Sequence, residues 1–578
     1  MVEHTSPAEF YDSRPWKDEY GPGISPELVP LPYKNLGELV RQACIEYAAK
    51  TAFTICLDNG MTASLKYHKV DVLSDQFAAY LRHELKLQPE DRVAIQLPNC
   101  LSYPVAAFGI FKAGCVLVNV NPLYTADEMN HQLKDSGAKV LLIIDMFANK
   151  LGQALRGTNV EKVLLVSIAE FFPKLTGALV KTVLKLKKQI PAPTAPAETF
   201  ASALAAGKRH LKAAGPVPND RGRDDLAVLQ YTGGTTGVAK GAMLTHGNLL
   251  SNLAQSLTVA GDVNRPGEEV VLTALPLYHI FAFTYNLLSF FQIGGHNILI
   301  PSPRPVSNLK PAFEKFQITR ASGVNVLFAG LLREEWFRTN PPRHLEITIS
   351  GGTALHSAIA EEWQKVVGGK ILEGYGLSET SPTLAVNPIK GENRIGTIGI
   401  PMPSTEIRIV DEQGNPVPPG QPGELVARGP QVFKGYWNRP EETEAAMRDG
   451  WFHTGDIAIM DERGYLRIVD RKKDLIDVSG FNVYPNEVED CIARIPAVAE
   501  VAVIGVPLPE GGERVRAYVV STDPNLTEED VIKHCRQHLT AYKVPKEVIF
   551  REELPKTPVG KVLRKDLRAE VLREIGKT

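Results

Sequence analysis

The densest chemistry in the chain lies at residues 231–241, which read YTGGTTGVAKG and follow the apolar run LAVLQ. Glycines let a backbone come close to a phosphate group and point N–H groups at it, because no Cβ atom intrudes. Threonine hydroxyls add donors, and lysine adds positive charge. A P-loop needs glycine directly before its lysine, whereas Ala239 precedes Lys240 here. The run therefore predicts a phosphate-binding loop of another kind, with a flexible turn as the alternative.

Seven further motifs cluster polar, aromatic and glycine residues along the chain: NVNPLYT (119–125), PLYHIFA (276–282), EGYGLSET (373–380), GYWNRPEET (435–443), DGWFHTGD (449–456), VDRKKDLIDVSGFNVYPNEVE (469–489) and PKTPVGKVLR (555–564). Together with the glycine-threonine loop, they resemble the adenylate-forming (AMP-binding) superfamily of acyl-CoA synthetases, luciferases and peptide-synthetase adenylation domains. The loop itself is most similar to that of the long-chain fatty acid–CoA ligases. This resemblance covers nearly the whole chain.

The resemblance implies an enzyme that joins a long-chain fatty acid to coenzyme A. It would use ATP and Mg²⁺, pass through an acyl-adenylate, and release AMP and pyrophosphate. Fatty acid, ATP and coenzyme A are thus the expected small-molecule partners. Three alternatives stay open: a medium-chain or aryl acid–CoA ligase, an acyl-AMP ligase that loads a separate carrier protein, and a fatty-acid-binding protein without catalysis. The last is disfavoured because every expected polar group is present.

By resemblance, one set of residues binds the nucleotide and the coenzyme. Tyr375 can stack on adenine, Ser378 can donate to the α-phosphate, and Asp456 can accept hydrogen bonds from the ribose diol beside Arg471. The family usually has threonine where Ser378 stands, so the hydroxyl is kept. The predicted set is Thr232, Gly233, Gly234, Thr235, Thr236, Gly237, Gly351, Gly352, Tyr375, Gly376, Ser378, Asp456, Arg471 and Gly480.

Catalysis is expected to depend on Lys561, Glu379 and Lys240. Attack of a carboxylate on the α-phosphorus brings two anions together, so the developing charge must be neutralised. Glu379 is the predicted Mg²⁺ ligand, and Lys240 and Lys561 supply positive charge. Without its PVGK context, a lysine seventeen residues before the last one in the chain is typical of a solvated surface charge. The role of Lys561 therefore comes from the resemblance.

The resemblance also implies a moving C-terminal domain. In the family this domain rotates after pyrophosphate leaves, and a thiol then takes the acyl group. Residues at the boundary absorb the change in backbone angles, and the VDRKKD motif places this hinge at Lys473. The turn 479–481 would then face the active site, where Gly480 leaves room for the pantetheine arm.

Three residues are expected on the acid side of the site: His279, Val324 and Gly374. His279 falls at the family position near the acyl and pyrophosphate path, with a hydrogen-bonded core histidine as the alternative. It is not assigned as a general base, because a carboxylate substrate is already ionised. Small and aliphatic residues at 324–330 and after His279 suit an alkyl chain, whose burial contributes roughly 0.8 kcal/mol per CH₂. They leave the chain length open.

A lysine-rich segment stands apart from these motifs. Residues 173–190 read PKLTGALVKTVLKLKKQI, with lysines at 174, 181, 185, 187 and 188 among Leu, Val and Ile. As a helix it would be basic and amphipathic and able to lie on an anionic membrane surface. The alternative is an ordinary surface helix with a solvated lysine face.

Hydrophobic periodicity predicts an α/β fold. Apolar runs alternate with helical patterns from about Leu36 onward, which indicates crossover units and parallel-type sheets. Turn signals at about 395–470 indicate an antiparallel, β-rich subdomain. Past Arg471 a compact pattern of strands and helices indicates a small α+β domain, which the resemblance implies is mobile. We thus predict an AMP-binding domain at 1–470 and a C-terminal domain at 471–578.

Composition limits the remaining classes. A net charge of −2 argues against nucleic-acid binding, which needs a strong positive field. The six cysteines show no metal or redox spacing, so separate reduced thiols are expected. The polar N-terminus lacks a signal peptide and no run of about 18 apolar residues occurs, so we expect a cytoplasmic enzyme. Peripheral contact with the inner face of the membrane and a homodimer both remain open.

Overall fold

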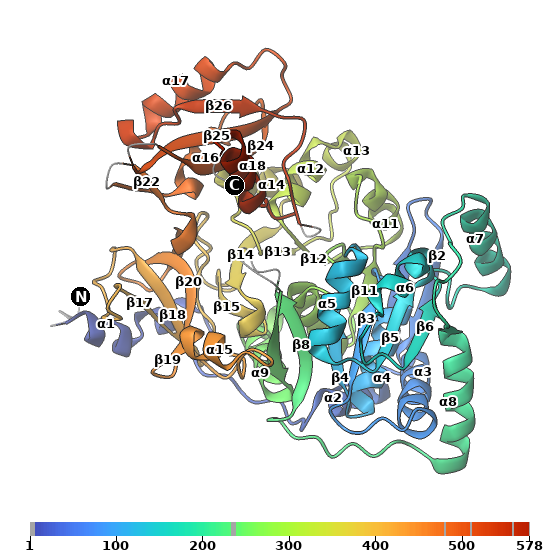
Figure 1. Ribbon diagram of the computed structural model, residues 1–578. Helices are drawn as coiled ribbons and strands as arrows, with labels where there is room; N and C mark the ends of the chain where they lie inside the picture. Colours follow the sequence, from blue (N-terminus) through green and yellow to red (C-terminus); the bar gives the residue numbers. More distant parts are fainter. Residues whose placement is uncertain (1–5, 233–238, 479–480, 509–510, 558–559, 577–578) are drawn as a thin grey trace.

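The computed structural model describes residues 6–232, 239–478, 481–508, 511–557 and 560–576. Two large sheets with helices around them form the N-terminal part, an antiparallel sheet lies beside them, and a three-stranded sheet with its helices sits above (Figure 1). The predicted α/β fold class is confirmed. The longer helices are α1 (Pro7–Ser13), α2 (Leu36–Glu46), α3 (Tyr67–Ala79), α4 (Ser102–Lys112), α5 (Ala126–Ser136), α7 (Lys174–Leu186), α8 (Phe200–Ala214), α9 (His246–Ala260), α12 (Asn325–Arg333), α14 (Ser357–Val367), α15 (Pro440–Ala446), α16 (Pro485–Ile492), α17 (Glu528–His538) and α18 (Arg564–Glu574).

A seven-stranded sheet has the order β7-β6-β5-β3-β4-β8-β9. Its neighbours are parallel except for β8 and β9, which are antiparallel. Continuous apolar runs form its central strands because both faces of a parallel sheet are covered. The strands are β3 (Arg92–Gln96), β4 (Val116–Asn119), β5 (Val140–Ile144), β6 (Lys162–Val166), β7 (Glu198–Thr199), β8 (Leu226–Thr232) and β9 (Lys240–Thr245).

A nine-stranded sheet has the order β16-β15-β14-β13-β12-β10-β11-β1-β2. Its strands from β14 to β1 are parallel, and β2, β15 and β16 are antiparallel to their neighbours. The carboxyl ends of parallel strands meet at one edge, so the loops after β12, β13 and β14 lie together there. The strands are β1 (Thr51–Cys56), β2 (Thr62–Lys66), β10 (Val270–Thr273), β11 (His296–Leu299), β12 (Arg320–Gly323), β13 (Ile347–Ser350), β14 (Lys370–Gly376), β15 (Thr383–Val386) and β16 (Ile400–Pro401).

One hydrophobic core joins the two large sheets. It contains buried side chains of α2, α3, α4 and α9 together with strands of both sheets, such as Phe53 of β1 and Val93 of β3. Phe53 stacks on Phe291, and Phe108 of α4 packs against the same ring. The two sheets are therefore held as one body beneath the edge where their loops gather.

The β-rich region forms a five-stranded antiparallel sheet, as predicted for about 395–470. The N-terminal helix α1 packs on this sheet, and Phe10 and Trp16 share a core with Ile407 and Leu425 (Figure 1). The strands are β17 (Glu406–Val410), β18 (Gly423–Arg428), β19 (Met447–Arg448), β20 (Trp451–Met460) and β21 (Leu466–Arg471).

The C-terminal part has its own core, built from β24, β25, α16 and α17. A hairpin of β22 (Ile476–Val478) and β23 (Phe481–Val483) precedes the three-stranded sheet of β24 (Val498–Pro507), β25 (Glu513–Ser521) and β26 (Glu547–Phe550). Strands β24 and β25 are antiparallel, and β25 and β26 are parallel. The exact division between residues 470 and 471 stays a prediction.

One strand was not anticipated from the sequence. After the glycine-threonine loop, β9 pairs with β8, so that Lys240 lies opposite Thr232, and α9 follows. All six cysteines are free and buried. Among the described residues, the helices are too short or too polar to cross a bilayer.

Candidate active site

A cavity of about 2260 Å³ lies where the loops of the nine-stranded sheet meet the C-terminal part. Its walls come from both halves of the chain, including α12, β14, β20, α16 and the segment before α18. Every described residue of the predicted site lines it: Thr232, Lys240, His279, Val324, Gly351, Gly352, Gly374, Tyr375, Gly376, Ser378, Glu379, Asp456, Arg471, Lys473 and Lys561. Gly233, Gly234, Thr235, Thr236, Gly237 and Gly480 lie outside the described residues.

Tyr375 and Arg471 converge on one carboxylate. The Tyr375 hydroxyl donates to Asp456 Oδ2 over 2.5 Å, and Arg471 Nε lies 3.3 Å from Asp456 Oδ1. Asp456 is only 4% exposed and belongs to β20, whereas Arg471 ends the neighbouring strand β21 and lies directly opposite it in register. Antiparallel pairing therefore fixes the aspartate–arginine contact, and the turn after β14 adds the tyrosine.

Glu379 is a buried carboxylate that faces the cavity. The Tyr436 hydroxyl donates to its Oε1 atom over 2.8 Å. Burial raises the pKa of Glu379, and the tyrosine hydrogen bond opposes that rise. A carboxylate kept from water in this way gains from a cation beside it. The described residues hold no cluster of three or more acidic, histidine or cysteine side chains that could bind a metal ion by themselves.

Close backbone turns shape the floor of the cavity. A Cβ atom at Gly376 would collide with the Pro382 carbonyl, so only glycine allows the turn that presents Ser378. Gly352, with φ of +79°, turns the chain after β13. The nearby Thr353 hydroxyl is buried and has no hydrogen-bond partner within the described part of the chain. A buried hydroxyl without a hydrogen bond costs free energy, so this part of the cavity wall favours a polar ligand.

Lys561 reaches the cavity from the C-terminal part. Loss of hydration and repulsion by Arg471 lower its pKa to about 7. Its loop is packed on the N-terminal part, because a Cβ atom at Gly560 would lie 3.1 Å from Arg304 Nη2 and 3.3 Å from Val324 Cγ2. Burial, together with the nearby Lys561 charge, lowers the pKa of His279 to about 4. His279 is therefore neutral at pH 7.

The glycine-threonine loop contributes its two described ends, Thr232 and Lys240. Lys240 Nζ lies 5.3 Å from the centre of the Tyr436 ring and 4.0 Å from Glu442 Oε1. Both partners come from the segment that also supplies the hydrogen bond to Glu379. Lys240 therefore lies on the same side of the cavity as Glu379.

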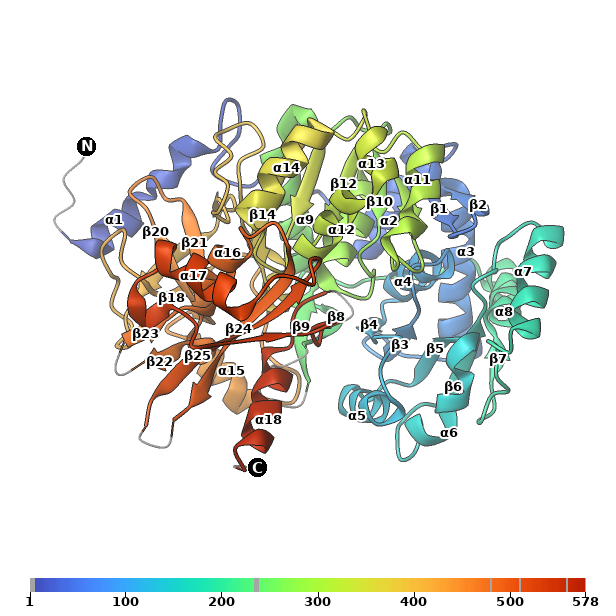
Figure 2. The ribbon, with the colours of Figure 1, turned by 90° about the horizontal axis from the view of Figure 1, so that it is seen from above.

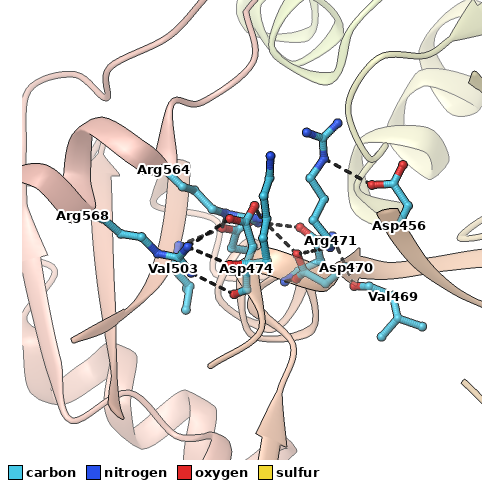
Figure 3. Close-up of polar contacts among 11 residues, drawn as sticks. Asp456, Val469, Asp470, Arg471, Asp474, Val503, Arg564 and Arg568 are labelled. Carbon is cyan, nitrogen blue, oxygen red and sulfur yellow. Dashed lines mark hydrogen bonds and ion pairs between the residues drawn. The ribbon is translucent and has the colours of Figure 1, made fainter. Parts of the chain in front are cut away.

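The boundary around Lys473 is crossed by a network of arginines from α18 (Figure 3). Arg564 donates to Glu489 over 2.8 Å and lies 3.2 Å from Asp470, which is completely buried. Arg568 donates to the Lys473 carbonyl over 3.0 Å and pairs with Asp474 over 3.2 Å. These contacts fix the strand that carries Arg471 relative to the helix that follows Lys561.

Hydrophobic side chains line another branch of the cavity. Phe281 and Tyr285, from the helical stretch after His279, pack in a cluster with Ile347 and Ile349 of β13. Val324, Val326 and Ala329 add further apolar surface. The segment 324–330, whose lining role was predicted, forms α12 from Asn325 onward.

Three residues of the site were missed by sequence reasoning. Tyr436 lies in the GYWNRPEET motif, but nothing in that motif indicates its contact with Glu379. Glu373 precedes Gly374 and accepts a hydrogen bond of 3.0 Å from the Leu355 amide, and burial raises its pKa to about 8. Arg564 closes the PKTPVGKVLR motif. Each depends on partners more than fifteen residues away, which a linear pattern does not reveal.

The chain is similar to known proteins over most of its length. Residues 40–437 match the family model of AMP-binding enzymes, and residues 487–561 match that of the AMP-binding enzyme C-terminal domain. It is 48% identical to the long-chain-fatty-acid–CoA ligase of Escherichia coli O6:H1 and 38% identical to that of Bacillus subtilis, over 96% of this chain and 98% of each relative. The crystal structure of ATP-bound MatB from Rhodopseudomonas palustris superposes with a TM-score of 0.79 at 30% identity, over 94% of this chain and 99% of MatB. The chain belongs to the AMP-binding enzyme family, alongside the long-chain-fatty-acid–CoA ligases.

Proposed function

We propose that the chain joins a long-chain fatty acid to coenzyme A through an acyl-adenylate, consuming ATP and releasing AMP and pyrophosphate. The observation that carries this proposal is the single cavity shared by Glu379, Asp456 and Lys561, with an apolar branch beside it. Full-length similarity to curated ligases of this activity supports the choice of acid. A phosphate loop, a ribose-type carboxylate and an alkyl pocket on one cavity are what such a reaction needs.

In the first half-reaction, Asp456 holds the ribose diol and the Tyr375 ring stacks on adenine. Ser378 and the amides of the glycine-threonine loop bind phosphate oxygens, and Lys240 adds positive charge on the same side. Glu379 would hold Mg²⁺, which neutralises phosphate charge when it is bound. Lys561 stabilises the charge that develops at the α-phosphorus as the fatty carboxylate attacks. His279 is uncharged at pH 7 and has no proton to remove from the fatty acid, because the carboxylate is already ionised.

In the second half-reaction, coenzyme A takes the acyl group. In this arrangement Lys561 lines the cavity, whereas Val478 and Phe481 of the β22–β23 hairpin do not. We propose that rotation about Lys473 withdraws Lys561 and brings the hairpin, with Gly480, to the cavity. The arginine network around Asp470 and Asp474 must rearrange during this movement.

Ile347 and Ile349 of β13 line the apolar part of the cavity, and the buried Arg320 lines it as well. Arg320 lies opposite Ile347 at the start of parallel strands, roughly 10 Å from the Ser350 end at a rise of about 3.3 Å per residue. Arg320 is 1% exposed and donates to Glu269 over 2.9 Å and to Glu346 over 2.8 Å. The charges of Arg320 and Glu269 act on Tyr285, and the Tyr285 ring packs edge-on against Phe290. We infer that Tyr285 closes the far end of the acyl pocket.

Replacing Tyr285 by alanine is expected to shift the preference of the enzyme toward longer acids. Each methylene newly buried contributes about 0.8 kcal/mol, so kcat/KM for the longer acid should rise about fourfold per added carbon relative to wild type. The measurement is the ratio of kcat/KM values across saturated acids from octanoate to stearate. Tyr285→Phe keeps the ring and serves as the control. An unchanged ratio in Tyr285→Ala would place the end of the pocket elsewhere.

The function itself is tested by measuring thioester formation with ATP, coenzyme A and a panel of acids. Palmitate is expected to be used in preference to octanoate and 4-coumarate, with AMP and pyrophosphate as products. Preference for the aromatic acid, or transfer to a carrier protein but not to coenzyme A, would contradict the proposal. Removal of Mg²⁺ by a chelator is expected to stop the reaction.

The proposal places the enzyme in the cytoplasm, with peripheral contact at the inner face of the membrane. The lysine-rich segment 173–190 supports this contact, because its positive charge suits anionic headgroups. A homodimer is part of the same proposal, and sedimentation of the purified chain tests it independently of the reaction.

A further inference from the structure

Helix α7 (Lys174–Leu186) carries apolar side chains on two opposite faces. Gly177 and Val180 are buried against the body of the protein, where Gly177 packs on Phe172. The other face is exposed, and it gathers four of the largest exposed apolar side chains of the described chain: Leu175 (87%), Leu179 (56%), Val183 (40%) and Leu186 (78%). We call these four residues the α7 ridge. A solitary exposed leucine needs no explanation, but four on one face do.

Helix geometry makes the α7 ridge continuous. Successive residues turn by roughly 100°, so the four side chains fall within roughly 80° of one another. The packed residues Gly177 and Val180 lie on the far side of the helix. The ridge is therefore not a frayed part of the core but a second apolar surface on a helix that is already anchored.

Lysines border the α7 ridge. Lys174, Lys181 and Lys185 fall within roughly 40° of one another along one flank, and Lys187 lies at the end of the other flank. Lys181 also approaches Asp145 and Glu170, where its charge opposes the burial-driven rise in their pKa. Lysine stems can extend along an apolar surface while their ammonium groups reach polar headgroups.

The charge around the α7 ridge favours an anionic partner. Residues 171–219 contain eight lysine and arginine side chains against one glutamate, whereas the whole chain has a net charge of −2. The basic residues at 208, 209 and 212 belong to α8, which lies beside α7 at the end of the molecule remote from the C-terminal part (Figures 1 and 2). A leucine ridge bordered by lysines, on a lysine-rich stretch of the chain, has the composition of an interfacial helix.

We propose that the α7 ridge is a membrane-docking surface, which inserts its leucines among the acyl chains of an anionic bilayer while the bordering lysines bind lipid headgroups. This proposal rests on the membrane contact that is part of the proposed function, and it names the surface that makes this contact. It does not depend on the ligase reaction. Docking through the α7 ridge leaves the catalytic cavity open to solvent and the C-terminal part free to move. Helix α7 lies at the opposite end of the molecule from the C-terminal part in both views (Figures 1 and 2).

The test is flotation of the full-length protein with phosphatidylcholine vesicles and with phosphatidylcholine–phosphatidylglycerol vesicles. The wild type is expected to float with the anionic vesicles only, and less at high salt. The triple variant Leu175→Ser, Leu179→Ser, Leu186→Ser should lose at least roughly tenfold in vesicle partitioning. Lys185→Glu, Lys187→Glu, Lys188→Glu should lose more than roughly hundredfold, at about fivefold per lysine removed.

Matched controls separate the α7 ridge from general effects. Ile45→Ser and Val29→Ser remove exposed apolar side chains elsewhere and should float as the wild type does. Thioester formation with a short soluble acid should be unchanged in every variant, so a failure of docking is distinct from a failure of the ligase proposal. Wild-type protein that does not float, or a leucine variant that floats normally, would overturn the proposal. A dimer that the leucine variant converts to monomer would instead assign the ridge to a second copy of the chain.

Discussion

Replacing Lys561 by methionine is expected to lower acid-dependent ATP–pyrophosphate exchange by roughly 10²–10³-fold, the usual cost of removing one group that stabilises transition-state charge. Methionine keeps the length and apolar stem of the side chain, and the fold should survive because the loop is held by its backbone. Lys561 N–H donates to Thr557 Oγ1 over 3.0 Å, and Gly560 packs against Val324. Exchange isolates the first half-reaction, so it is the right measurement.

The depressed pKa of Lys561 also predicts a pH dependence. In the free enzyme the lysine loses its proton near pH 7, so kcat/KM for ATP should fall as pH rises above about 7. Bound phosphate raises the pKa of Lys561 again. The fall in the pH profile of kcat should therefore come at a higher pH than the fall in the profile of kcat/KM. The stability of the fold changes with pH in the opposite direction to the activity. In the unfolded chain Lys561 keeps its proton up to about pH 10.5, so the free energy of unfolding rises between pH 7 and 10.5. Lys561→Met should lose both effects.

Lys565→Met is the matched control, because Lys565 is exposed on α18 only four residues away. It should leave exchange and both pH profiles unchanged. Thioester formation from synthetic acyl-adenylate provides a second check, since that step does not need the adenylation lysine. Equal losses in exchange and in thioester formation would contradict the assigned role of Lys561 and indicate a folding defect.

Replacing Glu379 by glutamine is expected to weaken the Mg²⁺ dependence of the reaction and to lower exchange by on the order of 10²-fold or more. Glutamine has the same shape, and its amide oxygen can still accept the Tyr436 hydroxyl. Because burial raises the pKa of Glu379, removing its charge should not lower the melting temperature. The measurement is a Mg²⁺ titration of exchange at saturating ATP, in which the half-maximal concentration should rise.

Tyr436→Phe separates the metal role from the hydrogen bond. It removes the 2.8 Å contact but keeps the carboxylate, so Mg²⁺ should bind with little change. If Glu379→Gln and Tyr436→Phe shifted the Mg²⁺ titration equally, the carboxylate would not be the metal ligand. An unshifted titration in Glu379→Gln would exclude that role directly.

Much of the architecture could be predicted from local pattern. The apolar runs at 93–98, 115–120 and 140–145 predicted strands, and these strands form the centre of the seven-stranded sheet, where both faces are covered. Turn signals in 395–470 correctly indicated the antiparallel sheet. Strand β9, which pairs with β8 after the glycine-threonine loop, was not predicted, because a short strand at an antiparallel edge has no period long enough to distinguish it from a loop.

The sequence by itself determined the chemical types at the site. Closely spaced glycines, threonines and a lysine predicted phosphate binding, and the motifs of Tyr375, Glu379 and Asp456 predicted the nucleotide side through their resemblance to the family. These predictions are local, because motif residues carry their own turn chemistry. The structure places every described member of that set on one cavity.

Only the tertiary structure decided what each of these groups meets. Register pairing sets Arg471 against Asp456, and packing of distant segments joins Tyr436 to Glu379. The pKa of Lys561 near 7 arises from desolvation beside Arg471, which lies ninety residues earlier in the chain. The α7 ridge is exposed because the body of the protein covers only the opposite face of its helix. Distances, burial and field depend on contacts between remote residues, and no linear spacing encodes them.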